Sequence, residues 1–111
     1  METTRQSKVS RLIQKDLGEI FQRNAQTLFA GAMITVTKVS ITRDLSIAKV
    51  YLSVFGKDPH NVIKLVQTSA KEVRKQLASR IKNQVKAIPE LRFFIDDSID
   101  YMENIEQLLK K

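Results

Sequence analysis

The sequence contains no cysteine and no tryptophan, and it has only one histidine, two prolines and three glycines. Without cysteine, the chain can form neither a disulfide framework nor a thiolate metal site. The single histidine, His60, has no partner for a nucleophile–base pair, and the three glycines are too far apart to form a phosphate-cradling loop. We therefore expect a protein that is not an enzyme and that carries no cofactor.

Long apolar runs are also absent. No segment is long enough to span a bilayer, and the N-terminal residues lack the apolar core of a signal peptide. The composition, with 42% apolar and 28% charged residues, is ordinary for a globular fold. We expect one cytoplasmic domain over residues 1–111, monomeric and with no membrane partner.

Acidic residues are scarce in the middle of the chain, which has a net charge of +7. Residues 57–92 carry nine basic and three acidic side chains, whereas residues 93–111 carry two and five. A concentrated positive field of this kind attracts polyanions. The charge therefore favours a nucleic acid as the partner. An anionic membrane surface is the rival, but the apolar residues beside this charge are mostly valine and alanine, there is no tryptophan, and the sheet needs that apolar face.

Residues 62–89 form the most informative stretch, because their apolar residues recur with helical spacing. The apolar stripe contains Val62, Val66, Ala70, Val73, Leu77 and Ile81. The opposite side carries five lysines, with Arg74 and Arg80 beside the seam: Lys64, Lys71, Lys75, Lys82 and Lys86. We expect the helix to end at Ile88, because the residue before a proline disfavours helical dihedrals.

The charged side of this helix has two interpretations. It can be a solvated face, since lysine is easily exposed. A solvated helix normally mixes both signs of charge, however, and here Glu72 is the only acid between residues 62 and 89. We therefore favour a polyanionic partner.

The remaining periodicity predicts a helix from Ser7 to about Asn24, strands at 34–41, 47–55 and 91–95, and a final helix capped by Ser98. The alternation in the first strand changes parity, which indicates a bulge near Thr37–Lys38. The small pair Ser69–Ala70 is the expected bend in the long helix. Residues 42–46 are the predicted hairpin loop.

This order predicts an α+β fold. The first two strands should be antiparallel, and the long crossover should place the third strand parallel to the second. Helices on one face of a three-stranded mixed sheet make a two-layer sandwich. The element order α-β-β-α(kink)α-β, followed by a C-terminal helix, is similar to that of type II KH domains, which bind nucleic acids.

Two strings strengthen a more specific resemblance. Residues 39–51, VSITRDLSIAKVY, resemble the hairpin signature of the bacterial ribosome-binding factor A family, and residues 89–98, PELRFFIDDS, resemble its last-strand motif. The resemblance covers essentially the whole chain. It implies a late assembly factor of the small (30S) ribosomal subunit that binds 16S rRNA in free, immature subunits, assists rRNA processing and matters most in the cold. It leaves open whether an assembly GTPase takes part.

The resemblance also implies an interhelical kink in place of the Gly-x-x-Gly loop that KH domains use to clamp nucleotides. Aligned on Arg74, this kink falls at Ser69, Ala70 and Lys71, with lysine where the family usually has glycine. A general KH-type RNA-binding protein that acts outside ribosome assembly is the alternative.

Bound rRNA would be held mainly through its phosphates, which position a protein without reading sequence. The candidate contacts are Lys71, Arg74, Lys75, Arg80, Lys82 and Lys86 from the helical stretch, with Arg43 and Lys49 from the hairpin. A magnesium site at Asp96, Asp97 and Asp100 is a further candidate, but acids in the first turn of a helix are also explained by its dipole. We therefore expect no metal.

Overall fold

The computed structural model describes residues 3–96. Its elements are α1 (Thr4–Arg23), α2 (Ala25–Leu28), β1 (Met33–Ile41), β2 (Ile47–Phe55), α3 (Pro59–Thr68), α4 (Ala70–Ile81) and β3 (Glu90–Ile95). The predicted α+β order is confirmed, with the short α2 as an addition. The final helix predicted from Ser98 lies outside the described residues.

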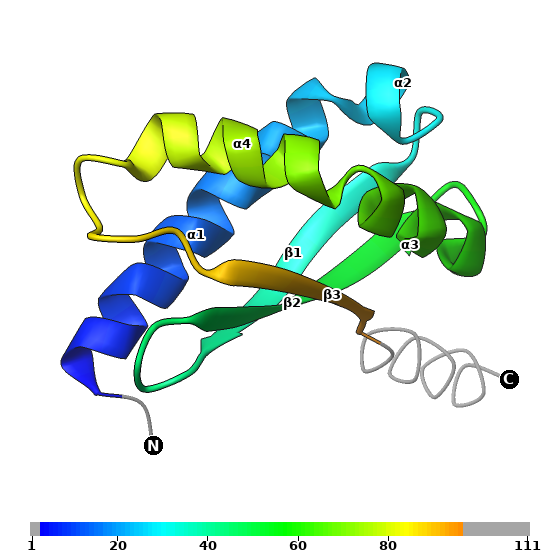
Figure 1. Cartoon of the computed structure of the whole chain (residues 1–111). Helices are drawn as coiled ribbons and strands as arrows, with labels where there is room; N and C mark the ends of the chain where they lie inside the picture. Colours follow the sequence, from blue (N-terminus) through cyan, green and yellow to red (C-terminus); the bar gives the residue numbers. More distant parts are fainter. Residues whose placement is uncertain (1–2, 97–111) are drawn as a thin grey trace, which may run out of the picture.

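The three strands form one mixed sheet in the order β1-β2-β3, as predicted (Figure 1). β1 pairs antiparallel with β2, and β3 pairs parallel with β2, with Ile47 opposite Glu90. The register of the antiparallel pair shifts between Val36 and Lys38, so the predicted bulge is confirmed. The bulge returns both halves of β1 to the same apolar face.

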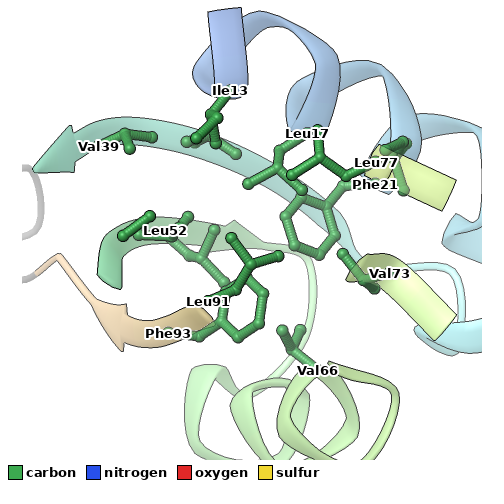
Figure 2. Packing of buried hydrophobic residues seen from close by; sticks show 14 of the residues in the cluster. Ile13, Leu17, Phe21, Val39, Leu52, Val66, Val73, Leu77, Leu91 and Phe93 are labelled. Carbon is green, nitrogen blue, oxygen red and sulfur yellow. The ribbon is translucent and has the colours of Figure 1, made fainter. Parts of the chain in front are cut away.

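One face of the sheet is buried under the helices (Figure 2). Inward-facing strand residues, among them Val39, Leu52 and Phe93, form one core with helix residues such as Leu17 and Leu77. The Phe21 ring packs against Phe29 and Phe93, with ring centroids 5.2 and 6.0 Å apart. By strand alternation, the outward-facing positions on the opposite side of the sheet include Lys38, Lys49, Tyr51, Arg92 and Phe94.

The first helix begins earlier than the sequence indicated, because Thr3 and not Ser7 is its N-cap. The Thr3 hydroxyl accepts from the Gln6 backbone N–H at 3.1 Å, and the Gln6 side chain accepts from the Thr3 N–H at 2.9 Å. This reciprocal pair is a capping box. Gln6 also donates to the Ile41 carbonyl at 2.9 Å, which fastens the start of α1 to the end of β1.

The long helical stretch ends earlier than predicted, at Ile81 and not at Ile88. Directly after α4 the chain makes a tight turn, in which the Gln84 N–H donates to the Ile81 carbonyl at 2.8 Å. β3 must begin beside the hairpin loop, where the Glu90 N–H donates to the Ser46 carbonyl at 2.8 Å. Continuing the helix to Ile88 would carry the chain about 10 Å further along the helix axis, away from that position. Tertiary pairing therefore overrides the helical pattern of residues 82–88.

The bend between α3 and α4 lies at Ser69, close to the predicted position. Ser69 closes α3 through its N–H to the Leu65 carbonyl, and its own carbonyl accepts from Val73, both at 2.9 Å. Lys71 lies within α4 and is exposed. Among the described residues, positive φ occurs only at Ala30, Gly31, Leu45 and Gly56. The kink therefore does not require a glycine at position 71.

The core predicts a clear contrast between two leucines. Leu77→Ala should lower the free energy of unfolding by about 2–5 kcal/mol, because it leaves a cavity in a close-packed interior. Leu65→Ala, at a position that is 37% exposed, should cost much less. Urea denaturation followed by circular dichroism measures both values. Equal losses in the two variants would contradict the described core.

Candidate nucleic-acid interface

The solvent face of α4 carries a row of three lysines. Lys71, Lys75 and Lys82 follow one another at spacings of four and seven residues, which return to the same side of a helix. All three are exposed, and none forms an ion pair with an acid in the part of the chain that the structure describes. Lys82 is the C-cap of α4 and keeps a helical backbone, so the row continues to the helix end.

Arg80 does not belong to this row, although the sequence pattern predicts it as a candidate. Its guanidinium bonds to the Asp16 carboxylate at 3.0 Å and also to Glu19, both on α1. Its hydrogen bond to Glu19 raises the pKa of Arg80, and the same bond lowers the pKa of Glu19. The charge of Arg80 is thus balanced by α1, and this side chain joins the two helices.

Arg74 is also engaged within the fold. Its Nη2 donates to the Ile88 carbonyl at 2.7 Å, and its Nε donates to the Pro89 carbonyl at 3.2 Å. These bonds hold the segment that joins α4 to β3. Arg74 is still partly exposed to solvent, but these two hydrogen bonds fix the orientation of its side chain.

The other three candidates lie on different parts of the surface. Lys86 lies on the segment after α4, and Arg43 lies in the loop between β1 and β2. Lys49 is outward-facing on β2, on the side of the sheet opposite the helices. The eight predicted residues therefore do not form one surface, and of these eight only Lys71, Lys75 and Lys82 form a continuous row.

Sequence reasoning missed the basic residues of α1. Residues 3–15 contain four basic and no acidic side chains, and all four are exposed: Arg5, Lys8, Arg11 and Lys15. The absence of acids was the signal available in the sequence. The two acids of α1, Asp16 and Glu19, come later and face Arg80. The first half of α1 therefore adds a second positive surface.

The hairpin loop is held in shape by one carboxylate. The Asp44 Oδ1 atom accepts from the hydroxyls of Ser46 and Thr42, both at 2.7 Å, and from the Ser46 N–H at 3.1 Å. These bonds, the one from the Ser46 hydroxyl foremost, lower the pKa of Asp44 from 3.8 to about 2. Next to it, Leu45 has a φ of 61°, which leucine rarely adopts.

No group of three potential ligands for a metal ion occurs between residues 3 and 96. Asp96 accepts a 2.5 Å hydrogen bond from the Thr37 hydroxyl, which ties the end of β3 to the bulge in β1. Asp97 and Asp100, the other members of the magnesium candidate, lie outside the described residues. Within the same limits, no helix is both long and apolar enough to cross a membrane.

Comparison with known sequences gives one consistent family. The family model described as ribosome-binding factor A matches residues 5–109. The ribosome-binding factor A of Cytophaga hutchinsonii is 41% identical over 112 residues, which cover all of this chain and 84% of that protein. The protein of the same name from Chlorobaculum tepidum is 40% identical over 108 residues, with coverage of 96% and 88%.

Solved structures agree on the fold. Crystalline ribosome-binding factor A from Thermus thermophilus matches with a TM-score of 0.69 and 19% identity, covering 81% of this chain and 94% of that one. A solution structure of a putative ribosome-binding factor A from Thermotoga maritima matches with a TM-score of 0.65 and 23% identity, covering 85% and 89%. A third match, at TM-score 0.64 and 21% identity, covers 79% and 91%; it is a homology model of the Thermus thermophilus protein fitted into a cryo-EM map of its 30S complex.

The role of Arg74 is testable with its conservative variant. Arg74→Lys keeps the charge but cannot reproduce the two-pronged contact with the Ile88 and Pro89 carbonyls. We expect a loss of about 1–2 kcal/mol in the free energy of unfolding, together with faster amide hydrogen exchange in residues 82–88. Lys75→Arg, at an exposed position of the same helix, is the control. Unchanged exchange in Arg74→Lys would contradict the structural role.

The Asp44 carboxylate predicts a pH dependence of stability. Because its pKa is lower in the folded chain, the ionised form stabilises the fold above about pH 4, and this contribution is lost as the pH falls toward 2. Asp44→Asn should therefore melt below the wild type at pH 7, and the difference should shrink between pH 4 and pH 2. Thermal melts at several pH values provide the measurement. A difference that stays constant down to pH 2 would refute this role.

Proposed function

The chain belongs to the ribosome-binding factor A family, and from that premise we propose that it binds the immature small ribosomal subunit through 16S rRNA and promotes its maturation. In this proposal the chain acts as a monomer in the cytoplasm and assists rRNA processing without catalysing a reaction itself. The observation that carries the proposal is the row of exposed lysines on α4, which have no acidic partner within residues 3–96.

The row suits the outside of a folded RNA. Lys71 and Lys75 are separated by about 6 Å along the helix axis, and Lys75 and Lys82 by about 10 Å. At these spacings, each ammonium group can approach a different backbone phosphate. Glu72 is the acid in the first turn of α4, and it accepts a hydrogen bond from Gln76 at 3.0 Å. Glu72 therefore contacts Gln76 and forms no ion pair with the lysine row among the described residues.

Two of the candidate residues are engaged within the fold, which favours a smaller contact surface than the sequence suggested. Arg80 is balanced by two carboxylates and Arg74 is bound to backbone carbonyls. Three phosphate contacts would give the logarithm of the affinity a slope of about −2 to −3 against the logarithm of salt concentration. Recognition then depends on rRNA shape, because phosphate contacts do not identify bases.

A general RNA-binding role outside ribosome assembly is the competing function. A protein with that function would bind RNA through the same lysine row but would not associate with free small subunits. Sedimentation of cell extracts separates the two: an assembly factor should travel with free small subunits and be absent from translating ribosomes. A protein found mainly outside the ribosomal fractions would favour the alternative.

The central prediction concerns two lysines of the row. Lys75→Glu combined with Lys82→Glu should weaken binding to immature small subunits by at least about tenfold, because two attractive phosphate contacts become repulsive. Circular dichroism and the melting temperature should stay close to the wild type, since both positions are exposed. Co-sedimentation with subunits from cells lacking the protein measures the affinity.

The matched control makes the same change of charge on the opposite side of the molecule. Lys38→Glu combined with Lys49→Glu alters two exposed, outward-facing sheet positions. We expect it to reduce binding only slightly, through the weaker overall field. If both double variants lose binding equally, net charge and not the α4 row is responsible. If only the control loses binding, the sheet face is the contact surface.

A further inference from the structure

A groove of about 520 Å³ lies where three distant parts of the chain meet. One wall is the first turns of α1, another is the hairpin loop at Asp44 and Leu45, and the third is the segment that joins α4 to β3. In Figure 1 these parts gather at the same end of the molecule, where α4 finishes. The volume lies within the range of about 300–1,000 Å³ that is usual for small-ligand sites.

The rim of the groove is positive. Arg5 and Lys8 come from one side and Lys86 from the other, and all three are exposed. None of them forms an ion pair with an acid among the residues that the structure describes. The acid on the rim is Asp44, whose Oδ1 atom already accepts three hydrogen bonds within the hairpin loop. The rim thus offers three cations to an anion.

The floor of the groove is apolar. Val9, Leu45 and Val85 are half-buried and pack against the core, and the buried Pro89 closes the groove. A smaller hollow continues past Lys8 to Leu12, with Gln84 on its other side. The exposed amide of Gln84 can both donate and accept hydrogen bonds, as base edges require.

Leu45 is the most unusual part of this floor. Its φ of 61° is one that glycine or asparagine would adopt more easily, so the backbone is strained at this leucine. The Asp44 bonds and the Leu45 N–H to the Thr42 carbonyl, at 2.9 Å, impose this conformation. The strained backbone places a large apolar side chain against the core, where it lines the groove.

We propose that this groove receives one unstacked nucleotide of the bound RNA. The base lies on the floor formed by Val9, Leu45 and Val85, and its flanking phosphates contact Arg5, Lys8 and Lys86. Single-stranded loops and bulges are the parts of RNA whose bases can be splayed out in this way. The proposal rests on the RNA-binding function above and adds to it a site that reads an exposed base, separate from the phosphate contacts of α4.

The test compares two RNA hairpins that share the same stem sequence and the same compact tetraloop with stacked bases, one with a fully paired stem and one with a single bulged 2-aminopurine in the stem. Fluorescence anisotropy of end-labelled RNA gives the two affinities for the full chain. We expect the wild type to bind the bulged hairpin about tenfold more tightly, since burial of one base against the apolar floor contributes on this scale. The fluorescence of the bulged base should also change on binding. Equal affinities in the wild type would overturn the proposal.

Two variants and one control locate the effect. Ala87→Leu narrows the groove from an exposed position without changing the charge or adding an aromatic ring, and it should abolish the preference for the bulge while leaving affinity for the paired hairpin unchanged. Thr35→Leu, exposed on β1 away from the groove, is the control and should keep the preference. Lys8→Gln should weaken binding of the bulged hairpin about threefold more than binding of the paired one, because it removes one phosphate contact at the groove. A preference that stays undiminished in both Ala87→Leu and Lys8→Gln would overturn the proposal.

The outcome separates this inference from the proposed function. Suppose that the wild type binds immature small subunits and the Lys75→Glu, Lys82→Glu double variant does not, but the wild type shows no preference for the bulged hairpin. In that case only the groove proposal fails. If the wild type binds neither hairpin nor small subunits, both proposals fail.

Discussion

The parallel pairing of β2 and β3 is the constraint on which the rest of the structure depends. Since both strands run the same way, the chain that leaves β2 at Phe55 must return to the Ile47 end before β3 can begin. α3 and α4 make this return across one face of the sheet, and the apolar sides of both helices are buried against that face. The segment after α4 is thereby brought beside the hairpin loop and the first turns of α1.

This return path also decides which positive charges face solvent. α4 lies against α1, so a cation on the side of α4 nearest α1 meets Asp16 and Glu19, and Arg80 is that cation. A cation on the side nearest β3 meets the carbonyls of the connecting segment, and Arg74 is that cation. Lysines on the remaining side of α4 form no ion pair with these acids and no hydrogen bond with these carbonyls among the described residues. The two arginines at the edges of the helix are thus engaged within the fold, and the lysine row stays exposed.

The sequence predicts the parts of the fold that depend on local periodicity. Strand alternation locates β1 and β2 and even the bulge, because the change of parity near Thr37 leaves only one way to keep both halves apolar on one side. Helical spacing identifies α1 and α4 and their buried faces. The capping box at Thr3 is also readable in the sequence, as a threonine followed three residues later by glutamine, one turn ahead of the predicted Ser7.

The sequence-based predictions differ from the structure where contacts between distant residues determine the conformation. Residues 82–88 contain no glycine or proline, so nothing local ends the helix at Ile81; the need to reach Ser46 does. The partners of Arg80 depend on how α1 crosses α4, which one sequence does not reveal. The position of Lys49 on the far face, by contrast, follows from its alternation with Ala48 and Val50, and it was predictable. The sequence therefore could not show which of the candidate charges, such as Arg74 and Arg80, also contact groups within the fold.

The kink makes side chains, and not backbone amides, the groups that can hold RNA in the proposed function. A Gly-x-x-Gly loop lets a phosphate approach the main chain, but between α3 and α4 the backbone is closed by Ser69 hydrogen bonds and Lys71 is fully helical. The positive-φ residues of the described chain lie in turns elsewhere. In the proposed function, affinity then comes from ammonium groups at the end of flexible side chains, which tolerate many RNA shapes. Discrimination is the role that we propose for the groove beside Asp44 and Leu45, a concave site that joins exposed cations to an apolar floor.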